Sequence, residues 1–232
     1  MKFSIVCPTR NRPNNMMRLY NSIMSTASNP DEIELAFYID NDDLASQNII
    51  KKNYPRMKAV IGERIVLSEC WNKAYEITTG SIIGFVCDEA VFKTKDWDTK
   101  VEKAINSFND KIVVVFPYDG IHDKRNTSGY LFLHKNWIIA TGRLCPPYFS
   151  CDFNDTWLHE VARMIKRHKQ IDVQVEHMHF LKGKAKKDST HIERLQRGRR
   201  DKVRTLYKNL IHERISDASK LRNFITNYME NQ

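Results

Sequence analysis

Glycine is scarce in this chain, with 8 residues in a length of 232. Neither GxGxxG nor GxxxxGK(S/T) occurs, which excludes a Rossmann dinucleotide loop and a P-loop. A nucleotidyltransferase on a similar sheet usually carries a glycine-rich loop with a basic signature near its N-terminus. The scarcity of glycine therefore argues against that class as well.

The five cysteines form no CxxC pair and are odd in number, so we expect reduced core residues rather than a disulfide framework or a zinc site. No apolar run approaches the ~20 residues that span a bilayer. The N-terminal MKFSIVCPTR has neither the apolar segment nor the cleavage site of a signal peptide. With 41% hydrophobic and 28% charged residues, the chain is expected to be a cytoplasmic globular protein with no membrane partner.

Positive charge is concentrated in residues 181–204. This segment carries ten Lys and Arg residues against three Asp and Glu, whereas the whole chain has a net charge of +9. Such a segment suits a polyanion, which means the phosphates of a nucleotide, a nucleic-acid backbone or an anionic surface. The alternative is a basic helix that is simply solvated.

Short apolar segments alternate with amphipathic ones through the first half of the chain. We expect strands over residues 3–7, 34–39, 59–61, 82–87 and 112–116, and helices over 14–25, 68–78 and 96–108. This rhythm predicts an α/β fold with a mostly parallel sheet and helices on both faces.

The second half is less regular. It predicts strands over 130–133 and 171–175, a helix over 155–168, and helical structure from about 192 to 228. The simplest division is a catalytic domain over residues 1–190 and a basic C-terminal helical extension over residues 191–232 that packs on it.

The most informative stretch is GFVCDEAVF, residues 84–92. An apolar strand ends here on Asp88 and Glu89, which are costly to desolvate unless a cation meets them. Ligands bind at the carboxyl ends of strands in open α/β sheets, and oxygen ligands suit Mg²⁺ or Mn²⁺ carrying substrate phosphates. The alternative is a strand that ends in ordinary polar turn residues.

Two further strand ends carry polar side chains. The loop CPTRNRP follows the first strand, so its donors can meet a nucleotide, although two arginines in a turn are more often surface residues. Asp40 ends the second strand, where an acid commonly accepts a hydrogen bond from a base or ribose. In the alternative interpretation, residues 40–43 are a polar turn with a helix N-cap.

Asp155 and two histidines complete the candidates. Asp155 lies among aromatic residues in CDFNDTWL, where it is either a general base or a helix N-cap. His177 and His179 alternate along an expected strand, so both side chains point to one face. This arrangement favours binding of a metal or a diphosphate by one of them.

Taken together, the segments resemble an inverting, GT-A-type (Rossmann-like) nucleotide-sugar glycosyltransferase similar to family 2. The resemblance covers about residues 1–190 and follows the order IVCPTRNRP, YIDNDD, SECWNKAYEITTGSIIGFVCDEAVFKTKDWD, CPPYFSCDFNDTWL and VEHMHFLKGKAKKDST. Its most specific part is similar to small bacterial and phage enzymes in which DDxVF precedes TxGWD. The acidic motif departs from the commoner Asp-x-Asp, because Ala90 stands at the third position.

The resemblance implies a UDP-sugar donor, a Mn²⁺ or Mg²⁺ ion, and an acceptor hydroxyl that attacks in a single, inverting displacement. It also implies roles for matched positions: Pro8, Thr9, Arg10 and Arg12 along the uridine and diphosphate, Asp40 on the base, Asn72 on the nucleotide, Lys182 and Lys184 over the diphosphate, Asp88 and Glu89 with His177 or His179 on the metal, and Asp155 as catalytic base.

The acceptor is not fixed by the sequence. The basic segment, the lack of a membrane element and a Lys/Asn/Ile-rich composition favour a phage enzyme of the host cytoplasm that modifies 5-hydroxymethylcytosine in double-stranded DNA, contacted through residues 181–204. One alternative is the same enzyme class acting on a polysaccharide or protein. Another is a non-enzymatic basic nucleic-acid-binding protein, which would have no use for a buried acidic pair.

Overall fold

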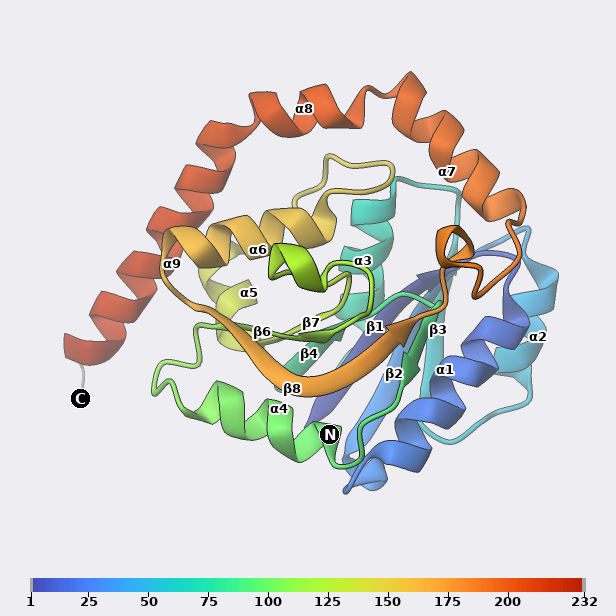
Figure 1. Ribbon diagram of the computed structural model, residues 1–232, viewed down its shortest axis with the longest axis horizontal. Coiled ribbons are helices and arrows are strands. Elements are labelled where there is room, and N and C mark those ends of the chain that lie inside the picture. The colour runs from blue at the N-terminus through green and yellow to red at the C-terminus, as the bar shows by residue number, and fades with distance from the viewer. Residues whose placement is uncertain (1, 231–232) are drawn as a thin grey trace.

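The computed structural model describes residues 2–230, so Met1 and residues 231–232, at the ends of the two expected domains, lie outside the described residues (Figure 1). Within them, the strands form an eight-stranded sheet in the order β3-β2-β1-β4-β7-β6-β8-β5. Its first four strands are all parallel, and they are β1 (Phe3–Thr9), β2 (Ile33–Asp40), β3 (Met57–Gly62) and β4 (Ile82–Phe85).

The other half of the sheet is mixed. It consists of β5 (Ala90–Phe92), β6 (Val114–Tyr118), β7 (Leu131–His134) and β8 (His168–His177). Strand β7 runs antiparallel to both β4 and β6, and β5 runs antiparallel to β8, whereas β6 and β8 are parallel. The expected α/β fold is confirmed, and its parallel character is strongest in the first half.

Alternation along the strands sends apolar side chains into a hydrophobic cluster on each face of the sheet. In β1, for example, Ile5 belongs to one cluster and Val6 to the other. The first cluster is covered by α1 (Pro13–Thr26) and α4 (Trp97–Asn106). The second is covered by α3 (Leu67–Glu76), α5 (Lys135–Thr141), α6 (Asn154–Met164) and α9 (Ile211–Glu230).

Several short elements escaped the sequence analysis. They are α2 (Leu44–Lys51), α5 and the three-residue strand β5. Strand β4 ends at Phe85 rather than at residue 87, which leaves Cys87 to Glu89 in a turn before β5. Strand β8 ends at His177, so the expectation that His179 continues the strand is wrong.

The C-terminal segment folds as three helices rather than a continuous one. They are α7 (Ser189–Arg200), α8 (Val203–Asn209) and α9, and they form an arc along one edge of the molecule (Figure 1). Lys202 has a left-handed backbone, with φ of 47°, which separates α7 from α8. Helix α9 packs on α5 and α6 through buried residues such as Leu221.

Over residues 2–230, the helices are all too short or too polar to cross a membrane.

Candidate active site at the carboxyl ends of β1 and β4

The acidic turn between β4 and β5 lies beside the end of β1, because these two strands are parallel neighbours and end at the same edge. Asp88 is 3% exposed and Glu89 is 7% exposed, so both predicted carboxylates are buried. Thr9, the last residue of β1, donates a hydrogen bond from its hydroxyl to Asp88 Oδ2 at 2.7 Å. The two carboxylates that follow β4 in the sequence are therefore buried beside the end of β1.

Arg12 provides the cationic partner that the buried acids need. Its Nη1 donates to Asp88 Oδ1 at 3.0 Å, and its Nε and Nη2 donate to the two oxygens of Asp188 at 2.8 and 3.0 Å. Burial raises the pKa of Asp88, while the charge and hydrogen bond of Arg12 and the hydrogen bond from Thr9 act to lower it. Arg12 thus links the acidic turn to the start of α7.

Glu89 accepts hydrogen bonds on both of its oxygens. His191 Nε2 lies 2.7 Å from Oε1, and His177 Nε2 lies 3.3 Å from Oε2. Burial would raise the pKa of Glu89, but His177, Arg12 and His191 together lower it to about 2. Burial likewise lowers the pKa of His177, but its contacts with Cys87 and Glu89 raise it to about 10.

One side of Glu89 faces two histidines that, together with it, could hold a metal ion. Glu89, His179 and His191 each offer a ligand atom, and these atoms all lie within 4.8 Å of one another. His179 caps the short helix η3 (Phe180–Lys182), and burial lowers its pKa to about 4, which keeps the imidazole in the neutral form that binds metals. One carboxylate with two imidazoles suits Mn²⁺ better than Mg²⁺, because Mg²⁺ prefers a shell of oxygen ligands.

A second polar network lies at the end of β2. Asp40 is 2% exposed and accepts a hydrogen bond from Arg10 Nη1 at 2.7 Å. Arg64, which the sequence analysis did not single out, donates to the same carboxylate and also to Glu193 of α7. The network places two guanidinium groups and one buried acceptor at the edge where the resemblance expects the nucleotide.

The remaining predicted nucleotide residues are more dispersed. Pro8 pairs with Tyr38 of β2 within the sheet. Asn72 donates to the Cys145 carbonyl at 3.0 Å and accepts from the Cys145 N–H at 2.9 Å, so its amide holds the loop before α6. Lys182 is exposed on η3, and Lys184 donates to Glu176 on β8 at 2.7 Å.

Asp155 is the second residue of α6, directly after a strained turn. Asp152 and Phe153 both have left-handed backbones, with φ of 44° and 61°, which costs roughly 1–2 kcal/mol per residue. Arg194 of α7 donates to Asp152 at 2.7 Å, and Tyr207 of α8 stacks on Phe153 with ring centroids 4.7 Å apart. Two C-terminal helices therefore hold the turn that leads into Asp155.

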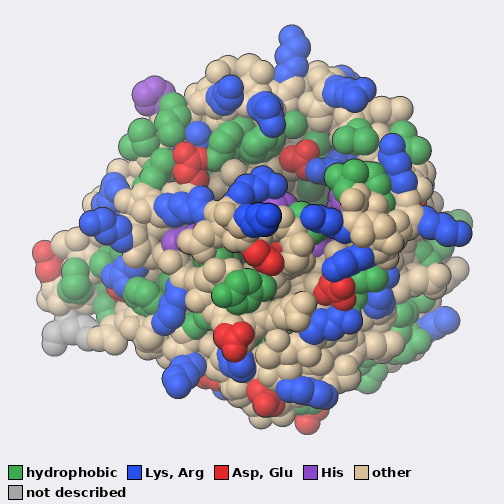
Figure 2. Space-filling model, viewed as in Figure 1, with side chains coloured by type: hydrophobic (Ala, Val, Ile, Leu, Met, Phe, Trp, Pro, Cys, Tyr) green, Lys and Arg blue, Asp and Glu red, His purple; other side chains and the backbone are tan. Residues whose placement is uncertain are grey.

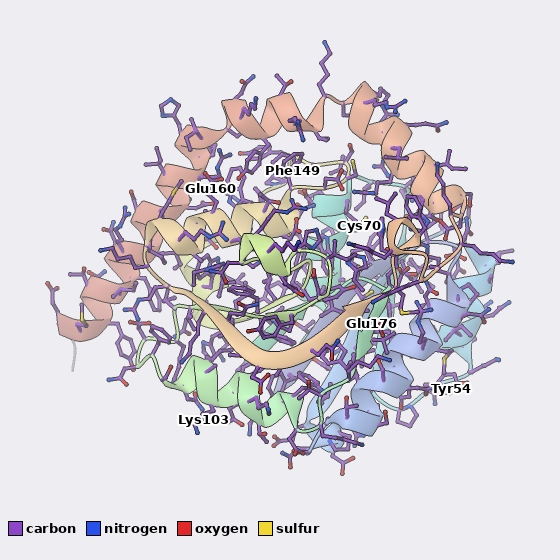
Figure 3. All side chains as sticks on the ribbon, viewed as in Figure 1. Tyr54, Cys70, Lys103, Phe149, Glu160 and Glu176 are labelled. Atoms are coloured by element: carbon purple, nitrogen blue, oxygen red, sulfur yellow. The ribbon has the colours of Figure 1, made fainter. Side chains whose placement is uncertain are left out.

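The aromatic residues that surround Asp155 in the sequence pack against one another and against α8. Phe149 lies between α6 and the arc of α7 and α8 (Figure 3), with ring centroids 5.9 Å from Trp157 and 6.2 Å from Tyr207. Glu160 of α6 pairs with Arg214, whose guanidinium lies over the Tyr207 ring. These contacts connect α6 to α8 and α9.

His191 and Asp188 are the main residues that the sequence analysis missed. Asp188 is the N-cap of α7, and His191 three residues later completes a capping box. The spacing of the capping box is present in KKDSTHIER, where the positive charge of the segment is the more conspicuous pattern.

No protein-family model matches the sequence, and no curated protein does either. Solved structures do match. The mannosyltransferase PcManGT from Pyrobaculum calidifontis, in complex with GDP-Man and Mn²⁺, matches with a TM-score of 0.62 and 12% identity, covering 100% of this chain and 76% of that one. S. aureus TarS 1-349 in complex with UDP-GlcNAc matches with a TM-score of 0.61 and 14% identity, covering 83% and 61%.

The chain spans only 36% of another TarS structure, at a TM-score of 0.59 and 14% identity over 76% of this chain. At these identities the likeness concerns the fold. The chain therefore has the mixed α/β, Rossmann-like fold of solved GT-A-like glycosyltransferases, as the sequence resemblance predicted.

Proposed function

We propose that this chain is a metal-dependent glycosyltransferase that uses a nucleotide-sugar donor. The observation that carries the proposal is the buried pair Asp88 and Glu89 at the end of a central strand, met by Arg12 and by histidines. Two desolvated carboxylates with cationic partners suit a divalent ion that carries a diphosphate. Glycosyltransferases that share this fold have been solved with UDP-GlcNAc and with GDP-Man and Mn²⁺.

The site residues divide into three tasks on the donor side. Glu89, His179 and His191 would hold the metal, which when bound neutralises charge on the departing nucleoside diphosphate. Arg10 and Arg12 would donate to phosphate oxygens. Asp40 would accept a hydrogen bond from an N–H of the base, and UDP is the donor nucleotide that we propose.

Asp155 is the proposed catalytic base. A carboxylate that removes the proton from an acceptor hydroxyl makes that oxygen a better nucleophile as it attacks the anomeric carbon. Attack from the face opposite the leaving diphosphate inverts the configuration in a single displacement. The contacts that hold the turn before α6 support this role, because a base must be held within hydrogen-bonding reach of the hydroxyl.

The acceptor we propose is 5-hydroxymethylcytosine in double-stranded DNA. Most Lys and Arg side chains of residues 181–204 are exposed, for example Arg199, Arg200 and Arg204. Figure 2 shows Lys and Arg side chains spread over the whole visible face of the molecule, including the edge where α7 and α8 lie, with acidic side chains among them. An exposed basic surface beside the site would contact DNA phosphates without reading the sequence.

The decisive experiment measures turnover of UDP-sugars and GDP-sugars with Mn²⁺ or Mg²⁺, with and without hydroxymethylated duplex DNA. We expect metal-dependent turnover that Asp88→Asn lowers at least about 100-fold, because the substitution removes the buried charge that pairs with Arg12 beside the proposed metal ligand Glu89. Asp172→Asn is the matched control, since this carboxylate on β8 is fully exposed.

Each outcome has a defined meaning. Labelled DNA supports both the enzyme class and the acceptor. Turnover without labelled DNA moves the acceptor to a polysaccharide or protein. Salt-sensitive DNA binding with no binding of any nucleotide sugar contradicts the glycosyltransferase proposal and leaves a DNA-binding protein.

A further inference from the structure

A second cluster of potential metal ligands lies behind the acidic turn, where the loop after β6 meets the end of β8. Asp119 of this loop is 0% exposed. Its Oδ1 accepts hydrogen bonds from the backbone N–H groups of Ile121 and His122, and its Oδ2 accepts from the N–H of Gly129 at 2.8 Å. Backbone donors thus fix the carboxylate in place.

Two histidines complete the cluster. His122 Nδ1 lies 2.6 Å from Asp119 Oδ2. The ligand atoms offered by Asp119, His122 and His177 all lie within 4.8 Å of one another. A Cβ placed on Gly129 would lie 3.6 Å from His177 Nδ1 and 3.7 Å from Asp119 Oδ2, so both atoms border the space beside this glycine.

His177 Nδ1 is the unexplained atom of this region. It is buried and has no hydrogen-bond partner among the described residues, and only 12% of the His177 side chain is exposed. The other ring nitrogen, Nε2, faces Glu89 Oε2. A buried nitrogen without a partner is costly, and this one borders a carboxylate and a second imidazole.

We propose that Asp119, His122 and His177 form a second divalent cation site, and that Zn²⁺ is the ion it takes. Two imidazoles and one carboxylate are a common ligand set for Zn²⁺, with a remaining position for water. A metal-binding histidine usually donates its other N–H to a carboxylate, which fixes the ring, and Glu89 provides that carboxylate here. The cation would also satisfy His177 Nδ1.

Metal binding would break the present contact between two of the ligands. His122 Nδ1 and Asp119 Oδ2 lie 2.6 Å apart, which is a hydrogen-bond distance, and a Zn²⁺ ion bound by both atoms would replace that hydrogen bond as the two atoms move apart, because imidazole binds metal through a deprotonated nitrogen. The cation would tie the loop of residues 119–129 to the end of β8. Glu89 would separate the two metal sites, with Oε1 facing His191 and Oε2 facing His177.

This site is distinct from the proposed donor site, and its existence does not depend on transferase activity. The test is calorimetric titration of the full chain with Zn²⁺ in the absence of nucleotide. Because Zn²⁺ also suits the site of Glu89, His179 and His191, the titration uses His191→Ala, which removes a ligand of that site, and then adds His122→Ala. His122 is partly exposed on a surface loop, so its removal spares the core.

We expect His191→Ala to retain one equivalent of Zn²⁺ and the double variant to lose it, with affinity at least about 10-fold weaker. His191→Ala with His212→Ala is the matched control, because His212 is exposed on α9. Co²⁺ gives a second readout: visible absorption of a bound ion in His191→Ala that disappears in the double variant.

The opposite results overturn the proposal. If His191→Ala binds no Zn²⁺ while circular dichroism shows it folded, the cluster is only a hydrogen-bonded Asp–His pair that orders the loop. If the double variant binds Zn²⁺ as tightly as His191→Ala, then His122 is not a ligand. Neither result bears on nucleotide-sugar turnover.

Discussion

His191 Nε2 lies 2.7 Å from Glu89 Oε1, although the two residues are 102 positions apart in the chain. The contact exists because α7 returns to the carboxyl edge of the sheet after the chain has completed it. Asp188, the N-cap of the same helix, pairs with Arg12. Arg194 of the helix donates to Asp152 in the turn before Asp155. Helix α7 therefore connects the acidic turn with the start of α6.

This relationship predicts that His191→Gln lowers metal-dependent turnover of the donor. We expect the loss to be at least about 10-fold at limiting Mn²⁺ and partly reversed at high Mn²⁺, because a metal ligand is removed while the rest of the site stays. The measurement is donor hydrolysis against Mn²⁺ concentration. His212→Gln should leave the curve unchanged, and an unchanged curve for His191→Gln would exclude it as a ligand.

Much of the fold was predictable because it depends on local periodicity. Strands such as β1 and β4 are continuous apolar runs, and helices such as α1 have an apolar stripe, so both appear in the sequence. The antiparallel pairing of β7, and the existence of β5 with only three residues, depend on tertiary contacts. No local pattern encodes those contacts.

The site was predictable to a similar degree. Asp88 and Glu89 were found because a buried strand that ends on two acids is unusual in itself. The capping-box spacing relates His191 to Asp188, but nothing near His191 or Arg64 in the sequence signals its contact with Glu89 or Asp40. Each reaches that carboxylate only after a distant segment folds back. His177 was found, but the end of β8 separates it from His179, and strand alternation could not show that.

A second prediction concerns Arg194, which pairs with Asp152 before Asp155. We expect Arg194→Ala to lower kcat by roughly 10-fold to 100-fold with little change in the KM for the donor, because the left-handed turn loses a partner and the base is displaced. Steady-state kinetics with saturating acceptor measures this. Arg194→Lys should recover part of kcat, whereas Arg199→Ala, an exposed arginine of the same helix, should have no effect. Equal loss in both alanine variants would contradict a positioning role.

A third prediction follows from the buried pair His159 and His168, whose ring nitrogens lie 2.7 Å apart. Burial and the neighbouring His159 lower the pKa of His168 from 6.5 to about 3. The imidazole of His168 therefore binds a proton below pH 6.5 in the unfolded chain, but only below about pH 3 in the folded chain. The free energy of unfolding is fully retained above pH 6.5 and should fall by about 1.4 kcal/mol per pH unit below it.

Urea denaturation at pH 7.5 and pH 5 tests this, with an expected loss of about 2 kcal/mol from His168. In His168→Gln the pH dependence should be smaller by that amount, whereas His212→Gln should retain it. If the wild type and His168→Gln lose the same free energy, the imidazole is charged in the folded state.

A fourth prediction concerns the packing of α9. Leu221 is 0% exposed and belongs to the cluster formed with α5 and α6. We expect Leu221→Ala to lower the free energy of unfolding by about 2–5 kcal/mol, because it leaves a cavity in that core. Met229→Ala, at a residue that is 64% exposed on the same helix, should change it by less than about 0.5 kcal/mol. A similar small change for both would show that α9 does not contribute to the folded unit in solution.

The last prediction concerns the basic surface of α7 and α8. Removing Arg199, Arg200 and Arg204 together should weaken binding of hydroxymethylated duplex DNA and flatten its salt dependence, because each phosphate contact contributes about 0.9 to the slope of log K against log salt. We therefore expect the slope to become shallower by about 2–3. Fluorescence anisotropy between about 50 and 200 mM salt measures it.

The control removes the same charge elsewhere, at Lys51, Lys52 and Lys73, which are exposed on or beside α2 and α3. If only total charge matters, both triple variants will flatten the slope equally, and the basic surface is a solvated face. If the α7–α8 variant alone flattens it while turnover of the donor without DNA is unchanged, the surface acts on the acceptor and not on the diphosphate. That separation matters because Arg12 and Arg194, which face the site, would affect both measurements at once.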